Sequence, residues 1–246
     1  MTTALRQLAW WIQDYAYAVG CQARGSLSRT TADSFLSGDR TAVVVIPGVF
    51  ESWQFMLPLI TALHRAGHPV HVVPLLKRNR LDVRSAARLV ADHLAAAGLE
   101  VVVILAHSKG GLVGNYLMMA LDGDRRIERM IAICTPFSGS RYARYLVIPS
   151  LRIFSPRNAL TLQMAKEEAV NRRITSLYGL FDPHIPEGSI LPGANNVQLP
   201  SAGHFRILGD PATRRAVLEQ ADQPPAGPRG ASNKDAGQAA TPPADG

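Results

Sequence analysis

One serine of this sequence, Ser108, lies in a setting that could turn its hydroxyl into a nucleophile. The apolar run 99–105 predicts a buried strand and residues 109–121 predict a helix, so the chain must turn sharply between them. Such a turn lifts the hydroxyl clear of the strand, and it requires small residues two positions before and after the serine, which Ala106 and Gly110 provide. A serine at a helix start can also merely cap the helix, so the chemistry depends on partners elsewhere in the chain.

Two residues downstream could complete such a site. His204 follows the short predicted strand 196–199 and precedes the predicted helix 211–220, while Asp182 follows the predicted strand 174–180. An imidazole can take the proton of a serine hydroxyl, and a carboxylate behind it fixes its tautomer and stabilises the imidazolium. The alternatives are Glu187 as the acid and His184 as the base, although His184 follows Asp182 too closely to face it in the usual way.

The turn Ala106-His107-Ser108-Lys109-Gly110-Gly111, with an acid and then a histidine downstream, resembles the α/β-hydrolase family, and more closely its lipase and esterase branch. The resemblance covers about residues 41–220. It implies Ser108 as the nucleophile, Asp182 as the triad acid and His204 as the base. His107, beside the nucleophile, is expected only to pack against its neighbours.

The resemblance also implies an oxyanion hole made of two backbone N–H groups. One belongs to Lys109, directly after the nucleophile. The other comes from the loop after the predicted strand 41–46, where Val49 is the favoured donor and Phe50 the alternative. In this loop Pro47 stands where the family usually has a histidine, while the glycine that follows is retained.

The elements that must position these residues alternate along the chain. Strands are predicted at 41–46, 69–73, 99–105, 127–134, 174–180 and 196–199, and helices at 52–66, 82–97, 109–121 and 211–220. This alternation is typical of an α/β protein with a mostly parallel sheet and helices on both faces, which the resemblance extends to the three-layer α/β-hydrolase fold. Pro58 predicts a kink or a late start of the helix 52–66.

The stretch from 135 to about 171 shows no regular period, and the resemblance implies a cap or lid there. Its apolar content suits either an acyl-chain pocket or additional core, and includes Phe137, Tyr142, Tyr145, Leu146, Val147, Ile148, Leu151, Ile153 and Phe154. Basic residues are interleaved with them, and the loop after the strand 69–73 adds Lys77, Arg78 and Arg80.

Two terminal segments flank the predicted domain. Residues 1–40 are expected to form a helical segment that packs on the domain or lies at a lipid surface through Trp10, Trp11 and Tyr15. The interruption by Gln13 and Asp14 argues against a signal peptide or a membrane span, although residues 18–21 faintly resemble a lipoprotein cleavage box before Cys21. Residues 221–246, rich in Pro and Gly, are expected to be a disordered tail.

Composition limits the partners. The net charge is +7, but no zinc-finger spacing or RNA-binding motif accompanies it, so we expect no nucleic acid and, at most, peripheral contact with an anionic membrane. The two cysteines form no C-x-x-C pair, and neither a metal nor an organic cofactor is implied. Nothing demands an oxidising compartment, so a cytoplasmic location is expected, with lipoprotein anchoring at Cys21 as the alternative.

The favoured interpretation is a carboxylic-ester hydrolase that acts on lipid or other hydrophobic esters through an acyl-enzyme. An acyltransferase, a thioesterase or an amidase would use the same triad, because the shape of the pocket chooses the acceptor. A non-catalytic binding module of the same fold is the alternative from another class. The sequence does not distinguish oligomeric states.

Overall fold

Residues 3–27, 29–145 and 149–224 are described by the structure, which is a computed structural model. The predicted tail from residue 225 onwards, and Leu146, Val147 and Ile148 of the predicted lid, lie outside the described residues.

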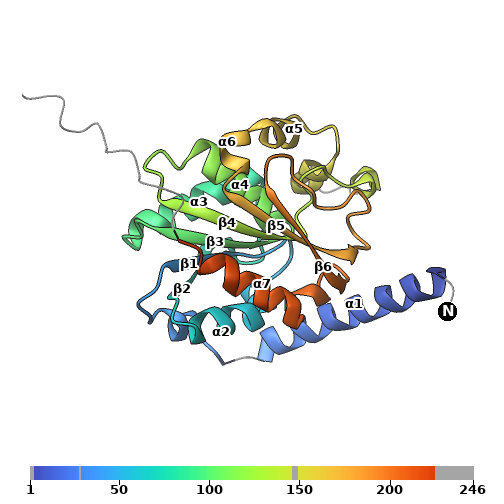
Figure 1. The fold of residues 1–246 in the computed structure, drawn as a ribbon, viewed down its shortest axis with the longest axis horizontal. Coiled ribbons are helices and arrows are strands. Elements are labelled where there is room, and N and C mark those ends of the chain that lie inside the picture. Colours follow the sequence, from blue (N-terminus) through green and yellow to red (C-terminus); the bar gives the residue numbers. More distant parts are fainter. Residues whose placement is uncertain (1–2, 28, 146–148, 225–246) are drawn as a thin grey trace, which may run out of the picture.

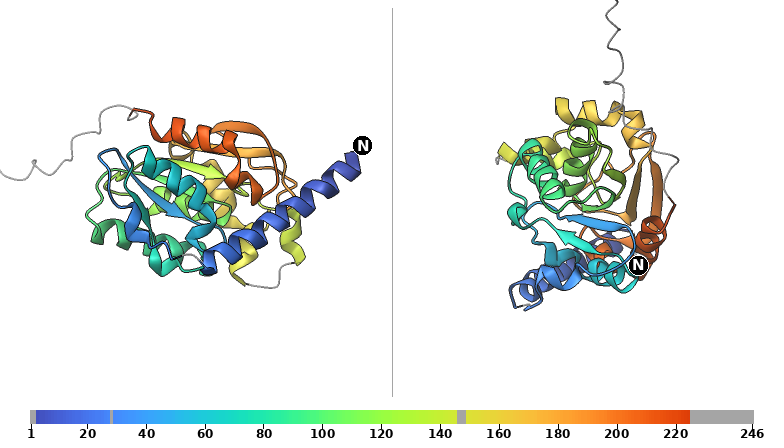
Figure 2. Two further views of the ribbon diagram at one scale, coloured as in Figure 1. Left: turned by 90° about the horizontal axis from the view of Figure 1, so that it is seen from below. Right: turned by 90° about the vertical axis from the view of Figure 1, so that its left-hand side faces the viewer.

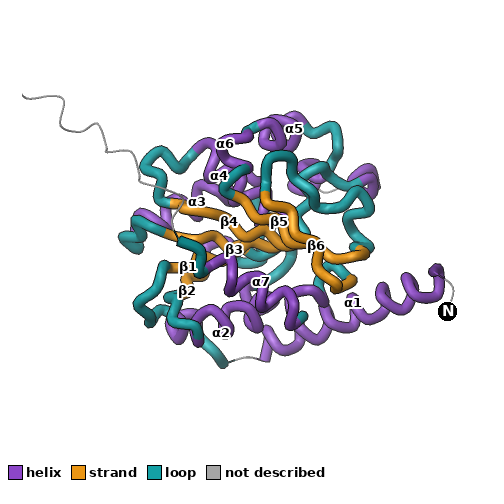
Figure 3. Tube along the Cα trace, viewed as in Figure 1, coloured by secondary structure: helices purple, strands orange, loops and turns teal. Residues whose placement is uncertain are grey.

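Six parallel strands form the central sheet in the order β2-β1-β3-β4-β5-β6 (Figure 3). They are β1 (Ala42–Ile46), β2 (Val70–Val72), β3 (Val102–His107), β4 (Ile127–Ile133), β5 (Ile174–Phe181) and β6 (Asn195–Ala202). All six residues of β3 are buried, as expected of a strand covered on both faces. Parallel pairing brings the carboxyl ends of all six strands to one edge of the sheet.

Helices cover both faces of this sheet (Figures 1 and 2). One face carries α3 (Val83–Ala96) and α4 (Lys109–Ala120), and the other carries α1 (Thr3–Leu27), α2 (Leu57–Arg65) and α7 (Pro211–Ala221). Successive strand residues point to opposite faces, so Val44 and Ile46 join one core cluster while Val43 and Val45 join the other. The predicted three-layer α/β architecture is confirmed.

Most predicted elements appear within a few residues of their expected ends. The predicted helix 52–66 begins late, as Pro58 indicated: a 3-10 turn over Trp53–Met56 precedes α2, and Pro58 occupies its first turn. The irregular stretch contains two short helices that its sequence did not reveal, α5 (Ala159–Lys166) and α6 (Glu168–Asn171). Asn158 caps α5 by accepting hydrogen bonds from the N–H groups of Leu160 and Thr161.

The 25-residue helix α1 occupies most of the predicted N-terminal segment and packs beside α2 and α7, while its first turns extend beyond the rest of the fold (Figure 1). Trp10 stacks on Phe181, and Cys21 is buried in the core on this face. None of the described helices combines the length and hydrophobicity that crossing a lipid bilayer requires.

Candidate active site

Ser108 lies where the strand order of the sheet reverses. From β1 the chain continues to β2 on one side, whereas β3 and all later strands lie on the other side, so the loops after β1 and β3 diverge. Such a switch point leaves a crevice at the carboxyl edge of a parallel sheet. Ser108 follows β3 directly and lies in this crevice, immediately before α4.

The turn at Ser108 is as tight as its small neighbours predicted. Ser108 has φ 51° and ψ −120°, a strained conformation for a residue with a side chain. A Cβ on Gly110 would lie 2.1 Å from the carbonyl oxygen of Ile46, and a Cβ on Gly111 would lie 2.0 Å from the hydroxyl of Thr135. Both glycines therefore let α4 begin close against the ends of β1 and β4.

The structure brings Ser108, His204 and Asp182 together. Nε2 of His204 lies 3.0 Å from Oγ of Ser108, and Nδ1 of His204 lies 2.8 Å from Oδ2 of Asp182. Both distances suit hydrogen bonds, with the imidazole between the hydroxyl and the carboxylate. Because the carboxylate accepts from Nδ1–H, the lone pair on Nε2 faces the serine hydroxyl. The imidazole of His204 can therefore take the proton of Ser108.

His204 and backbone donors together favour the ionised form of the Asp182 carboxylate. Its Oδ1 accepts from the N–H groups of His184 and Ile185 at 2.8 and 3.1 Å. Burial alone would raise the pKa of Asp182, but His204 and the N–H of His184 outweigh it and lower the pKa to about 2. Burial lowers the pKa of His204, but Asp182, followed by Glu51 and Asp14, more than offsets this and the pKa is raised.

Neither alternative triad member takes the predicted role. The His184 ring packs beside the His204 ring with 4.8 Å between centroids, and burial lowers its pKa to about 4, so it is neutral at pH 7. Glu187 instead pairs with Arg141 at 2.7 Å. The geometry therefore favours His204 over His184 as the partner of Ser108, and Asp182 over Glu187 as the partner of His204.

The loop after β1 leaves one N–H group free near the nucleophile. The N–H of Gly48 donates to Oε2 of Glu51 at 2.8 Å, and the N–H of Phe50 donates to the carbonyl of Arg78 at 2.8 Å, so Phe50 is already engaged. Within the described residues, the N–H groups of Val49 and Lys109 have no hydrogen-bond partner. Val49 and Lys109 thus remain the two candidate oxyanion donors.

The side chain of Lys109 points away from the crevice. It is fully buried, and its Nζ donates to the carbonyls of Asn79, at 2.9 Å, and Leu81. Burial lowers the pKa of Lys109 to about 8. The ammonium thus secures the loop 77–81, which in turn holds the loop after β1 through a 2.7 Å hydrogen bond from Asn79 to the carbonyl of Pro47.

His107 does more than pack, contrary to the sequence expectation. Its Nδ1 lies 2.8 Å from Oε2 of Glu51, and its Nε2 lies 3.0 Å from the carbonyl oxygen of His204. All three residues are buried. The ring therefore joins the loop after β1, through Glu51, to the backbone of the candidate base. His107 and Glu51 are 56 residues apart in the sequence, and no local sequence pattern indicates that they pair.

Asp14 of α1 is a second residue that sequence reasoning missed. Its side chain is fully buried, and its Oδ1 accepts from the N–H groups of Phe205 and Arg206, both at 2.8 Å. The sequence signal was present, because Asp14 is the only acidic residue in α1 and stands between two apolar runs. From the sequence alone, however, it indicates only an interruption of a hydrophobic segment.

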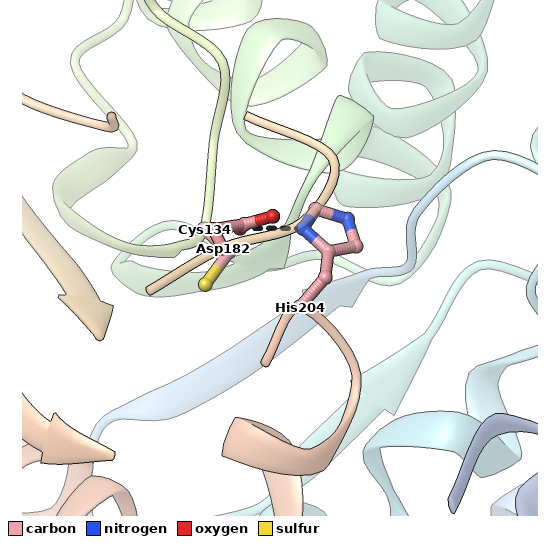
Figure 4. Close-up of side chains that lie close together, drawn as sticks. All are labelled: Cys134, Asp182 and His204. Atoms are coloured by element: carbon pink, nitrogen blue, oxygen red, sulfur yellow. Dashed lines mark hydrogen bonds and ion pairs between the residues drawn. The ribbon is translucent and has the colours of Figure 1, made fainter. Parts of the chain in front are cut away.

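Among the described residues, one group has side chains of the types that bind metals. The ligand atoms of Cys134, Asp182 and His204 lie within 4.8 Å of one another (Figure 4). Burial raises the pKa of the Cys134 thiol well above its usual range, so the sulfur stays protonated, and Nδ1 of His204 already bonds Asp182. These three side chains therefore fit a hydrogen-bonded Asp–His pair beside a neutral thiol better than a metal centre.

A cavity of about 480 Å³ opens over Ser108 and His204. Most of its walls are apolar. They are formed by α1, by the segments that follow β1, β4 and β5, by residues of the irregular stretch 135–171, and by the loop around Phe205. The apolar lining residues are Ala18, Val19, Val49, Phe50, Phe55, Pro136, Ala143, Leu151, Phe154, Ile185 and Phe205. The irregular stretch 135–171 thus contributes both to the cavity and to the core, where Phe137 and Ile153 are buried.

No protein-family model matches the sequence, and no curated protein matches it either. Solved structures do match. A Bacillus licheniformis lipase in its propeptide form superposes with a TM-score of 0.60 at 13% identity, over 79% of this chain and 55% of that one. A non-heme bromoperoxidase, assigned as such only provisionally, from Mycobacterium tuberculosis gives 0.56 at 13% identity, over 74% and 92%. A monoacylglycerol lipase from Paleococcus ferrophilus gives 0.53 at 17% identity, over 74% and 95%.

These superpositions concern the fold. The chain spans about half the length of the lipase that carries its propeptide, and nearly the whole length of the other two proteins. The chain has the α/β-hydrolase fold, as the resemblance of its turn at Ser108 implied. At this level of identity the activities of these proteins are not transferred to the chain, because one fold supports many functions.

Proposed function

We propose that this chain is a serine hydrolase that cleaves carboxylic esters with hydrophobic acyl groups through an acyl-enzyme intermediate. The observation that carries the proposal is the hydrogen-bonded series Ser108–His204–Asp182, at 3.0 and 2.8 Å, beneath an apolar cavity of about 480 Å³. His204 takes the proton of Ser108 as the oxygen attacks the ester carbonyl, and it returns the proton to the departing alcohol. Water then attacks the acyl group, activated by the same base.

The candidate oxyanion donors support this chemistry. Charge develops on the carbonyl oxygen as the tetrahedral intermediate forms, and preorganised N–H groups stabilise it. The N–H groups of Val49 and Lys109 are free of partners within the described residues; Val49 lines the same cavity as Ser108, and Lys109 follows Ser108 directly at the start of α4. Removing one such donor typically costs on the order of a hundredfold to a thousandfold in turnover.

The apolar walls support the choice of substrate class. Burying acyl carbons against Phe55, Leu151 and Phe154 removes apolar area from water. Each Å² of apolar area that is buried contributes about 25 cal/mol of favourable free energy to binding. The test is a series of p-nitrophenyl esters of increasing acyl length, measured with the wild-type protein and the Ser108→Ala variant. We expect kcat/KM to rise with acyl length before it levels off. A preference for acetyl esters over all longer ones would contradict the hydrophobic-ester assignment.

Delivery of such a substrate from an anionic lipid surface is part of the same proposal. A stripe of exposed apolar residues runs along α1 and reaches the cavity at Val19, which is 68% exposed and also lines the cavity. The stripe consists of Leu5, Leu8, Trp11, Ile12, Tyr15 and Val19. Near the mouth, guanidinium groups lie over exposed rings, with Arg80 over Phe50 and Arg144 over Tyr145. Apolar groups that enter lipid beside cations that meet phosphates suit such a surface.

A further inference from the structure

The loop that presents His204 is held from outside the α/β-hydrolase core by α1. The chain leaves β6 at Ala202, turns at Gly203, which has φ +109°, and presents His204 before a short 3-10 turn begins at Arg206. Oδ1 of Asp14 accepts from the N–H groups of Phe205 and Arg206, both at 2.8 Å. A Cβ on Gly203 would lie 2.5 Å from the same oxygen, so the carboxylate fits closely into the bend of the loop.

The carboxylate of Asp14 is costly to bury as it stands. Within the described residues it makes no ion pair with Lys or Arg, and its Oδ2 is buried without a hydrogen-bond partner. Burying a carboxylate costs free energy that hydrogen bonds only partly offset, and both hydrogen bonds of Asp14 go to the backbone of the loop that presents His204. The stability of α1 alone therefore does not explain why a carboxylate is buried at this position.

The reason lies in the residue that the bend of the loop presents. His204 follows Gly203 directly, and it is the group that becomes positively charged whenever Ser108 loses its proton. The titratable groups around its ring are Asp182, at 2.8 Å, the thiol of Cys134, within 4.8 Å, the rings of His184 and His107, at 4.8 and 4.9 Å between centroids, and the more distant carboxylates of Glu51 and Asp14. A fixed negative charge near the imidazolium stabilises the transition state of proton transfer.

We propose that Asp14 is a positioning residue for the catalytic base, so that α1 is a working part of the active site rather than an appendage of the fold. One oxygen of the carboxylate fixes the backbone of the loop on the C-terminal side of His204. His107 fixes the carbonyl of His204 on the other side, at 3.0 Å. The negative charge of Asp14 also favours the imidazolium form of the ring. This inference rests on the proposed function, in which His204 acts as the base.

The test compares Asp14→Ala and Asp14→Asn with a matched control, Asp82→Ala. Asp82 likewise accepts two backbone N–H hydrogen bonds through one oxygen, both at 3.0 Å, but at the start of α3. Asp14→Ala loses both the hydrogen bonds and the charge. Asp14→Asn keeps an oxygen for the two N–H groups and loses only the charge, so it stays informative even if the alanine variant fails to fold.

Two readouts are measured: ester hydrolysis, and the pKa of His204 by imidazole NMR on the whole protein, with His204→Gln used for assignment. We expect kcat to fall at least about tenfold in Asp14→Ala with KM nearly unchanged, because small misplacements of a base cost this much. In Asp14→Asn the loss should be smaller. In both variants the pKa of His204 should fall, since a neighbouring negative charge is gone.

The inference is overturned if the pKa of His204 is the same as in the wild type in both variants, or if Asp14→Ala loses no more activity than Asp82→Ala. A wild-type protein that hydrolyses no ester would sink the proposed function instead. In that case the NMR titration still decides whether Asp14 acts on His204, so the two failures are distinguishable.

Discussion

The choice between His204 and His184 as the base determines how Ser108 is activated. His204 bonds both Ser108 and Asp182, whereas His184 touches the triad only through its ring and its backbone N–H. We expect His204→Ala to lower kcat nearly as far as loss of Ser108, on the order of a million-fold, and Asp182→Asn to cost somewhat less. Esterase kinetics on the purified variants would measure both losses.

His184→Ala is the matched control for that pair, because it removes an imidazole from the same cavity wall. With a pKa lowered to about 4, His184 is neutral at working pH and adds no charge, so its removal should cost no more than about tenfold. A variant of His184 that is inactive, beside a variant of His204 that is active, would reverse the assignment of the base.

At the scale of elements, the turn between β3 and α4 sets the position of the nucleophile. Gly110→Ala places a Cβ against the backbone carbonyl of Ile46, which cannot move without disturbing β1. We expect it to destabilise the fold by about 1–3 kcal/mol, as overpacking of a rigid core does, and to lower activity in the folded fraction. Denaturant unfolding would measure this, with Gly123→Ala as the control, since a Cβ there meets nothing within 4 Å. Equal stability of the two variants would refute the tight turn.

The same elements show how far sequence reasoning reached. Continuous apolar runs predicted β1 and β3, and the small residues around Ser108 predicted the turn, because local sequence alone dictates both. The short helix α5 was missed, since Pro149 and Pro156 break the stretch before it and its first turn depends on the Asn158 cap. Pairings between distant segments, such as Asp14 with the His204 loop and Glu51 with His107, produce no periodic pattern in the local sequence. They could not be predicted because they depend on how the folded chain brings these segments together.

At the scale of the whole molecule, the exposed stripe of α1 and the basic loop 77–81 predict binding to anionic vesicles that weakens as salt rises. Exposed charges are screened over about 8 Å at physiological ionic strength, whereas apolar insertion is less sensitive to salt. Cosedimentation of the Ser108→Ala protein with anionic and zwitterionic vesicles would measure this without hydrolysis. We expect Ile12→Ser to weaken binding about tenfold, because a buried isoleucine contributes about 1.5–3 kcal/mol.

Leu121→Ser is the control for Ile12→Ser, since Leu121 is exposed at the far end of α4. Replacing Lys77, Arg78 and Arg80, all exposed, by Ala should remove most of the salt dependence. Equal binding to both kinds of vesicle, unchanged by salt and by these replacements, would remove the electrostatic part of the lipid-surface proposal and leave the ester-hydrolase proposal intact.

The most direct test of the central claim is covalent labelling by a fluorophosphonate, which reacts only with a serine that a neighbouring base activates. We predict that the wild-type protein gains one adduct by intact mass, that peptide mapping places it on Ser108, and that Ser108→Ala and His204→Ala remain unlabelled while still folded by circular dichroism. An unlabelled wild-type protein, or an adduct that persists in Ser108→Ala, would contradict the assignment of Ser108 as an activated nucleophile.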